Sequence, residues 1–214
     1  MHPRPYQLGR RQEATDQTRA RILTAARELL AAPEGYAGFT IDAVAHRAGV
    51  ARMTVYYQFT SKVGLLEALS DDLAARGHME HMSRVFTQAD PLDSVAEMVA
   101  VFADLWSADR PAMRRMRGLG GLDPEVGQVV QARDERRRHI ASVLVGRLAE
   151  RYGRPLPADL DQARDLLFTL TSFETFDSLA GADRAPVDVI PVIVRLARLG
   201  LGFDAPQVAA PPPA

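Results

Sequence analysis

The chain has 214 residues, of which 47% are hydrophobic and 25% are charged, values typical of a globular protein with enough apolar material for a core. It contains no cysteine, which excludes disulfide bonds, thiolate metal sites and a cysteine nucleophile. Because it has neither an apolar leader nor a run of about 18 apolar residues, we expect a cytoplasmic protein without a membrane span.

The charges are distributed unevenly along the chain. The formal net charge is −1, which alone would argue against a nucleic-acid partner. Residues 1–62, however, carry nine Lys or Arg against five Asp or Glu, whereas the remaining residues carry 17 basic against 22 acidic side chains. A basic segment on an acidic body is the distribution expected when only that segment binds a polyphosphate.

Short helices with clear start and stop signals are predicted near the N-terminus. Apolar residues recur at helical spacing over residues 16–32. A second helix is expected from the N-cap Thr40 to Gly49, and a third, at about 51–58, follows a turn of a few residues. Thr60 or Ser61 is expected to cap a fourth helix that ends near residue 77.

Every strong segment beyond residue 77 is again helical in period, at 94–107, 124–152, 158–179 and 187–201. No segment shows a sustained strand-like alternation, so the predicted fold class is all-α. We expect a flexible arm at residues 1–14 and a three-helix helix-turn-helix DNA-binding domain at 15–62. A helical ligand-binding and dimerisation domain is expected at 63–204, and a disordered tail rich in Pro and Ala at 205–214.

The third helix is too short, too polar and too aromatic to be a core element. At 1.5 Å per residue it is about 10–12 Å long, which fits a major groove about 12 Å wide. Near its start, Arg52 is suited to a bidentate contact with guanine, and Met53 and the Tyr57 ring to apolar contact with thymine methyl groups. These three residues are therefore predicted to contact bases.

Other polar side chains around this helix are suited to phosphate. The hydroxyl groups and the amide on the helix can donate to phosphate oxygens. Thr40 lies at the start of the second helix, and Lys62, the only lysine of the chain, lies at the start of the fourth. The N-termini of helices attract anions. The predicted phosphate contacts are Thr40, Thr54, Tyr56, Gln58 and Lys62.

From about Thr18 to Leu73 the sequence resembles the DNA-binding segment of TetR-type (TetR/AcrR-type) transcriptional regulators. The resemblance is carried by FTIDAVAHRAGVARMTVYYQFTSKVGLLEAL. It implies the base and phosphate contacts predicted above. Three positions depart from it: Ala51 replaces a frequent Ser or Thr cap, Met53 replaces a common Gly, and Asp42 stands where some members place a base-contacting cation. Asp42 is expected to act as a charge at a helix N-terminus.

The resemblance also implies that the last two long helices pair with those of a second subunit in a four-helix bundle. Their apolar residues are too many for one thin layer of a monomer to bury. A twofold dimer places two recognition helices about 34–36 Å apart on a palindromic operator. The predicted dimer residues are Phe173, Phe176, Leu179, Val189, Val192, Ile193, Leu196 and Leu199.

Methionines and aromatic residues of the body are candidates for the wall of a ligand pocket, although any one such residue is more often part of an ordinary core. Such walls adapt to small apolar or aromatic molecules. The candidates are His78, Met82, Phe86, Met98, Phe102, Trp106, Met113, Met116, Phe168 and Thr171. His78 and His81 have no third ligand at a suitable spacing, so neither a metal nor a cofactor is expected.

The sequence thus predicts a ligand-responsive repressor that leaves its operator when a small molecule shifts the fourth helix. A helix-turn-helix DNA-binding protein without a ligand is an alternative. An all-α enzyme is a remote one, since no nucleophile–base pair, metal cluster or phosphate loop is recognisable. The glycine-rich run 118–121 follows no predicted strand and is expected to be a flexible link.

Overall fold

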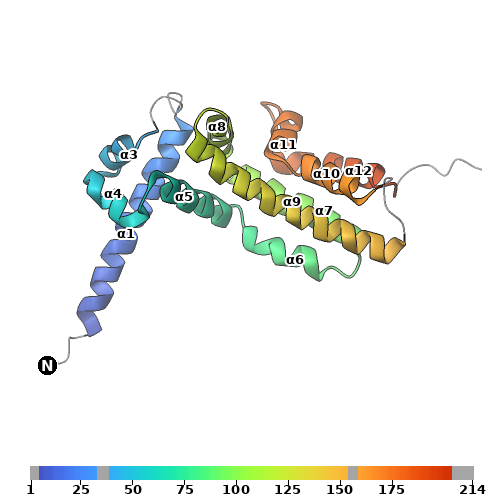
Figure 1. Cartoon of the computed structure of the whole chain (residues 1–214), viewed down its shortest axis with the longest axis horizontal. Coiled ribbons are helices and arrows are strands. Elements are labelled where there is room, and N and C mark those ends of the chain that lie inside the picture. Colours follow the sequence, from blue (N-terminus) through green and yellow to red (C-terminus); the bar gives the residue numbers. More distant parts are fainter. Residues whose placement is uncertain (1–4, 33–38, 154–158, 204–214) are drawn as a thin grey trace, which may run out of the picture. The chain divides into compact units, whose positions relative to one another are not determined.

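The regular elements of the chain are helices (Figure 1). The computed structural model describes residues 5–32, 39–153 and 159–203, and no strand occurs within these ranges. The all-α prediction is therefore confirmed. Within the same ranges, no helix combines the length and apolarity that crossing a membrane requires. The tail expected at 205–214 lies outside the described residues.

The chain divides into two compact units, formed by residues 1–76 with 109–132 and by residues 77–108 with 133–214. The DNA-binding domain expected at 15–62 lies wholly within the first unit. Residues 63–76 and 109–132, expected in the regulatory domain, belong to this first unit as well.

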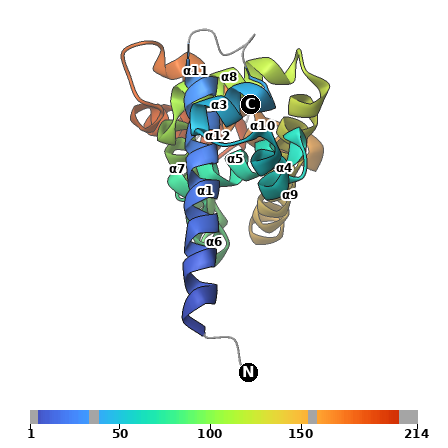
Figure 2. The same cartoon turned by 90° about the vertical axis from the view of Figure 1, so that its left-hand side faces the viewer.

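Among the described residues, six helices contribute to the first unit, and its core lies between them. Helix α1 packs against α3, α5 and α8, and its N-terminal half extends beyond α3 (Figure 2). Fully buried side chains from four of the helices include Ile22, Leu30, Val44, Val55, Leu65 and Leu69. The elements are α1 (Pro5–Ala31), α3 (Ile41–Ala48), α4 (Arg52–Phe59), α5 (Lys62–Arg76), α8 (Arg110–Gly120) and the start of α9 (Pro124–Tyr152).

The flexible arm predicted for residues 1–14 was wrong for the part that the structure describes, because α1 already begins at Pro5. Adding residues to an existing, packed helix costs far less than nucleating one. Local hydrogen bonds support the extension: Gln12 Nε2 donates to Asp16 Oδ1 at 3.1 Å, and Thr18 Oγ1 donates to the Ala14 carbonyl at 2.8 Å.

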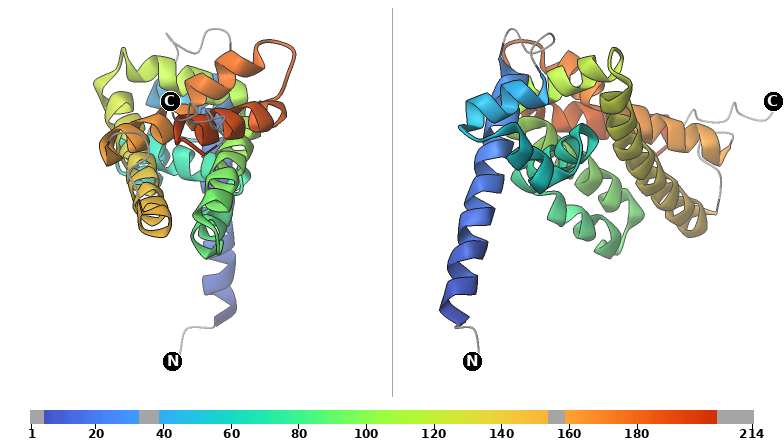
Figure 3. Two further views of the ribbon diagram at one scale, coloured as in Figure 1. Left: turned by 90° about the vertical axis from the view of Figure 1, so that its right-hand side faces the viewer. Right: turned by 60° about the vertical axis from the view of Figure 1, so that its left-hand side comes forward.

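The second unit is built around α7, which carries a nearly continuous apolar surface. Helix α12, drawn in red in Figure 3, packs against both α7 and α10. The predicted helix at 124–152 is confirmed at both ends as α9. The elements are η1 (Met79–His81), α6 (Met82–Thr87), α7 (Pro91–Ala108), the remainder of α9, α10 (Leu160–Leu170), α11 (Phe173–Ala180), η2 (Pro186–Val189) and α12 (Ile190–Gly200).

The helix predicted at 158–179 is interrupted, which corrects the sequence-based expectation. The Thr171 hydroxyl donates to the Leu167 carbonyl at 2.7 Å, and the Ser172 hydroxyl accepts from the Thr175 amide at 3.2 Å, so α10 ends and α11 starts here. The indole Nε1 of Trp106 donates to the freed Thr171 carbonyl at 3.1 Å. Side chains that bond to nearby backbone groups therefore replace the continuous helix.

The glycine-rich run 118–121 is not a flexible link, because Gly118–Gly120 form the last turn of α8. The sequence analysis did not predict α8, which carries four arginines. Asp109 caps it by accepting from the Ala112 amide at 3.1 Å. Its buried residues, Ala112, Met113, Met116 and Leu119, follow helical spacing and were the available signal.

Candidate nucleic-acid interface

The turn between α3 and α4 is fixed by signals at both ends of α3. The Thr40 hydroxyl accepts from the Ala43 amide at 3.1 Å and so caps the helix. Gly49 ends it with φ of +63°, a left-handed conformation that suits glycine. After two further residues α4 begins, so the angle between the two helices is set locally.

Helix α4 is held by only two buried side chains and presents most of its remaining surface outward. Val55 and Phe59 are 1% and 5% exposed, whereas Met53 and Tyr57 are 72% and 85% exposed. The guanidinium of Arg19 lies 4.5 Å from the Phe59 ring centre and fixes the end of the helix. Both side chains are therefore available on the outward surface of α4 for a contact with a partner.

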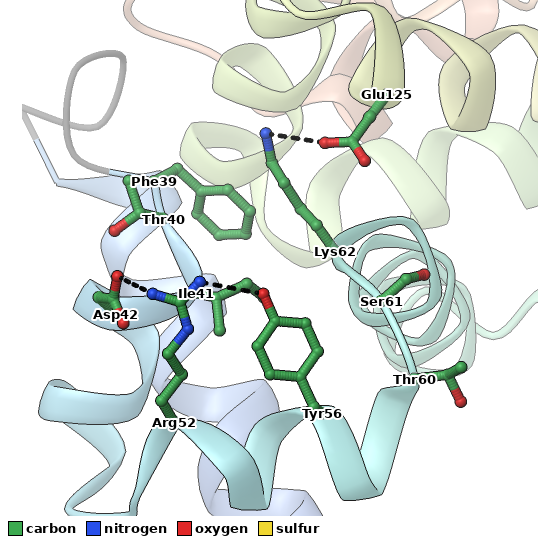
Figure 4. A pocket seen from close by; sticks show the side chains of 10 residues that line it. All are labelled: Phe39, Thr40, Ile41, Asp42, Arg52, Tyr56, Thr60, Ser61, Lys62 and Glu125. Atoms are coloured by element: carbon green, nitrogen blue, oxygen red, sulfur yellow. Dashed lines mark hydrogen bonds and ion pairs between the residues drawn. The ribbon is translucent and has the colours of Figure 1, made fainter.

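Arg52 is held by residues of both helices (Figure 4). Its Nη1 lies 2.6 Å from Asp42 Oδ2, and its Nη2 donates to the Tyr56 hydroxyl at 3.3 Å. The hydrogen bond to Tyr56 and the charge of Asp42 raise the pKa of Arg52. Asp42 lies in the first turn of α3, as expected, but its pairing with Arg52 was not predicted.

The junction between α4 and α5 is tight. Thr60 has φ of +66°, and the Ser61 amide donates to the Phe59 carbonyl at 2.7 Å, which closes a γ-turn. Of the two caps considered from sequence, Ser61 is the one that accepts from the Gly64 amide, at 3.0 Å. Only Thr60 and Ser61 consequently separate the end of α4 from Lys62 at the start of α5.

Lys62 forms ion pairs with Asp123 and with Glu125, whose Oε2 lies 3.5 Å away. Partial burial lowers the pKa of Lys62, but the hydrogen bond and charge of Asp123 outweigh it, so this pKa is raised overall. The hydrogen bond from Lys62 in turn lowers the pKa of Asp123. The residue predicted to hold phosphate is thus paired with carboxylates at the start of α9.

Four of the predicted DNA-contacting residues converge on one hollow of about 400 Å³ (Figure 4). Thr40, Arg52, Tyr56 and Lys62 contribute hydroxyl groups and cations to its lining. Met53 and Tyr57 project from the outer surface of α4, whereas Thr54 and Gln58 are half-buried and do not line the hollow. Two cations and several hydroxyl donors suit phosphate oxygens, and the carboxylates of Asp42 and Glu125, which also line the hollow, pair with these cations.

The candidate pocket residues are only partly brought together. Met98, Phe102, Trp106 and Thr171 are buried in the second unit, where the Phe102 and Trp106 rings stack with centres 5.9 Å apart. His78 and Phe86 are exposed, and Met82 and Phe168 are half-buried in the second unit. Met113 and Met116 belong to the first unit.

The predicted dimer residues fall into two groups. Four are buried within the single chain and so have no surface left to bury against a second subunit: Phe173, Phe176, Val189 and Ile193. The expectation that they require a partner is corrected. Val192, Leu196 and Leu199 on α12 are 44%, 42% and 38% exposed, and Leu179 is half-buried.

A short helix with an outward-facing reading surface, set by a glycine turn and flanked by phosphate-suited helix starts, defines a helix-turn-helix DNA-binding regulator. The family model for bacterial regulatory proteins of the tetR family matches residues 22–69. The transcriptional regulator SrpR of Pseudomonas putida is 35% identical over 153 residues, which are 68% of this chain and 67% of SrpR. The chain belongs to the TetR family of transcriptional regulators.

Other relatives are consistent with this assignment. The regulator TtgR, also of Pseudomonas putida, is 34% identical over 98 residues, which cover 45% of this chain and 46% of TtgR. Because its relatives are transcriptional regulators, the protein is not an enzyme, as the sequence analysis predicted.

Solved structures share the fold. The regulator FadR of Bacillus subtilis, solved in complex with stearoyl-CoA, superposes with a TM-score of 0.66 at 18% identity, over 85% of this chain and 98% of FadR. A TetR transcription regulator of Haloarcula marismortui gives a TM-score of 0.63 at 18% identity, over 87% and 97% of the two chains. At such low identity the likeness concerns the fold alone.

Proposed function

We propose that this regulator is a repressor that binds a palindromic operator as a homodimer and is released by a small apolar ligand. The outward surface of α4 carries the proposal. Met53 and Tyr57 project at 72% and 85% exposure beside the paired Arg52, a combination that matches the width and chemistry of a major groove.

Removing the two outward side chains tests the reading role of α4. We expect Met53→Ala with Tyr57→Ala to weaken binding to the preferred operator by about 10²-fold or more, because two base-contacting groups are lost. Stability is expected to change by only a few tenths of a kcal/mol, since both side chains are exposed. The wild-type chain first selects its site from randomised duplexes, and fluorescence anisotropy then measures affinity.

Phe86→Ala is the matched control, because Phe86 is 41% exposed but lies on α6. It is expected to leave operator affinity unchanged. Equal affinity of the wild-type and doubly substituted chains for the selected operator would contradict the proposed role of α4.

Lys62 is proposed to exchange its carboxylate partners for operator phosphate. Lys62→Ala is expected to weaken binding to every duplex by about tenfold and to reduce the slope of log K against log salt by about 1. Glu125→Gln removes one competing carboxylate while leaving Asp123 to cap α9, so it is expected to strengthen binding to every duplex. A Lys62→Ala effect confined to the selected operator would refute a phosphate role.

The proposed subunit interface centres on α12. Val192, Leu196 and Leu199 recur at intervals of four and three residues, so they share one face of the helix. Leu196 also lines a shallow hollow of about 470 Å³ with Leu179 of α11. Exposed apolar side chains around a hollow favour burial against the same surface of a second copy, which is the symmetry a palindrome demands.

The proposed ligand is a small apolar or aromatic molecule. An acyl-CoA, which is larger and charged but carries an apolar chain, is also tested because FadR of Bacillus subtilis, which shares the fold, was solved with stearoyl-CoA. Trp106, the only tryptophan, packs among aromatic residues of the second unit, so its fluorescence is a suitable reporter of binding. Adding a ligand that alters this fluorescence is expected to release the operator. An operator complex indifferent to every such compound would favour the ligand-free alternative.

A further inference from the structure

Asp42 and Arg52 form an ion pair that joins the two helices of the helix-turn-helix segment. Asp42 lies in the first turn of α3 and Arg52 at the start of α4. Their side chains are 64% and 55% exposed, and the N–O distance is 2.6 Å. The Tyr56 hydroxyl accepts from the other terminal nitrogen of Arg52 at 3.3 Å, so both ends of the guanidinium are held (Figure 4).

Stability does not account for this pair. Ion pairs between exposed side chains contribute little to the free energy of unfolding, because water screens them and ordering the side chains costs entropy. A carboxylate beside a surface that meets DNA also repels phosphate. An acid at this position is therefore unfavourable for affinity and nearly neutral for folding.

The benefit of the ion pair is the fixed orientation that it gives to the Arg52 guanidinium. A free arginine side chain samples many rotamers, and fixing it on binding costs conformational entropy. A bidentate contact with the O6 and N7 atoms of guanine requires the planar guanidinium to lie in one orientation. Anchors on two different helices fix that plane before DNA arrives. Each terminal nitrogen carries two hydrogens, so one on each stays available for the base.

We propose that Asp42 is a positioning residue for sequence recognition: by holding Arg52 it increases discrimination for guanine at one operator position while lowering affinity for DNA in general. The inference rests on the proposed operator binding. Asp42 acts through Arg52 and makes no base contact of its own. If Asp42 instead only blocked Arg52 from contacting DNA, removing the carboxylate would improve discrimination.

The test measures affinity for the selected operator and for a set of duplexes in which each base pair is replaced in turn. Arg52→Ala is expected to reduce discrimination at one position by about 10- to 100-fold. Asp42→Ala is expected to lose most of that discrimination at the same position while binding scrambled DNA several-fold more tightly. Combining the two substitutions is expected to cost no more discrimination than Arg52→Ala alone.

Two further variants separate positioning from charge. Asp42→Asn keeps an oxygen that accepts from Arg52, so it is expected to retain most of the discrimination while showing the same gain on scrambled DNA. Asp72→Ala breaks another surface Asp–Arg pair, with Arg76 at 2.7 Å, and is expected to leave discrimination unchanged at every position.

The outcomes distinguish this inference from the proposed function. A wild-type chain that selects no DNA sequence overturns the proposed operator binding. A wild-type chain that selects a sequence, together with an Asp42→Ala variant that discriminates equally well or better, overturns the positioning role alone. Loss of discrimination by Asp42→Ala that persists in the Arg52→Ala background also overturns it.

Discussion

Replacing Trp106 with alanine is expected to lower the free energy of unfolding by about 3–5 kcal/mol, the usual cost of emptying a large aromatic site in a core. Trp106 is 6% exposed. Its ring stacks on Phe102 at 5.9 Å and meets the edge of Phe173 at 5.7 Å between ring centres. Its indole nitrogen also donates to the Thr171 carbonyl, where α10 ends.

Trp106→Phe separates packing from hydrogen bonding. It retains an aromatic ring but removes the donor, which leaves the Thr171 carbonyl without its indole bond and is expected to cost about 1–3 kcal/mol. Urea unfolding followed by far-ultraviolet circular dichroism measures both variants, because the tryptophan signal is lost. A cost below about 1 kcal/mol for Trp106→Ala would be incompatible with a buried side chain in close contact.

Replacing Leu196 with glutamate is expected to abolish the proposed homodimer. In a twofold interface each substitution appears twice, so two carboxylates face the same apolar surface without partners. Single subunits then read one half-site each, and operator affinity is expected to fall by about 10²- to 10⁴-fold because the linked second contact is lost. The fold itself is expected to persist, since Leu196 is 42% exposed.

Sedimentation velocity and operator binding measure the two effects together. Leu122→Glu is the control, because Leu122 is 75% exposed but belongs to the first unit, whereas α12 belongs to the second. It is expected to leave both the mass of the assembly and operator affinity unchanged. A Leu196→Glu chain that sediments as a dimer with unchanged affinity would exclude α12 as the subunit interface.

Local signals explain which helices were predicted well. Thr40 and Gly49 specify the ends of α3 through a side-chain cap and a left-handed glycine, both visible in sequence. Helix α9 was predicted at both ends, from Pro124 to Tyr152. The break after α10 was missed because apolar residues keep helical spacing across it. It is marked by local bonds of the Thr171 and Ser172 side chains to nearby backbone groups, and the distant Trp106 indole binds the freed Thr171 carbonyl.

The candidate interface was likewise predictable from the sequence only in part. The outward positions of Met53 and Tyr57 follow from helical spacing around the buried Val55 and Phe59. The ion pairs do not follow from spacing. Arg52 pairs with Asp42, which lies ten residues earlier on another helix, and Lys62 pairs with Asp123, which lies 61 residues later in the chain. Such pairs depend on how helices pack, which periodicity alone does not determine.

The start of α4 has a consequence for how the protein meets DNA. Helices α3 and α5 begin with hydroxyl caps from Thr40 and Ser61, whereas Ala51 gives the first amides of α4 no side-chain acceptor. Because the first amides of a helix have no partner within it, the recognition helix α4 is the least secured of the three at its start. A phosphate oxygen at that end would complete the helix as it binds, so that the operator itself tightens the element that reads it.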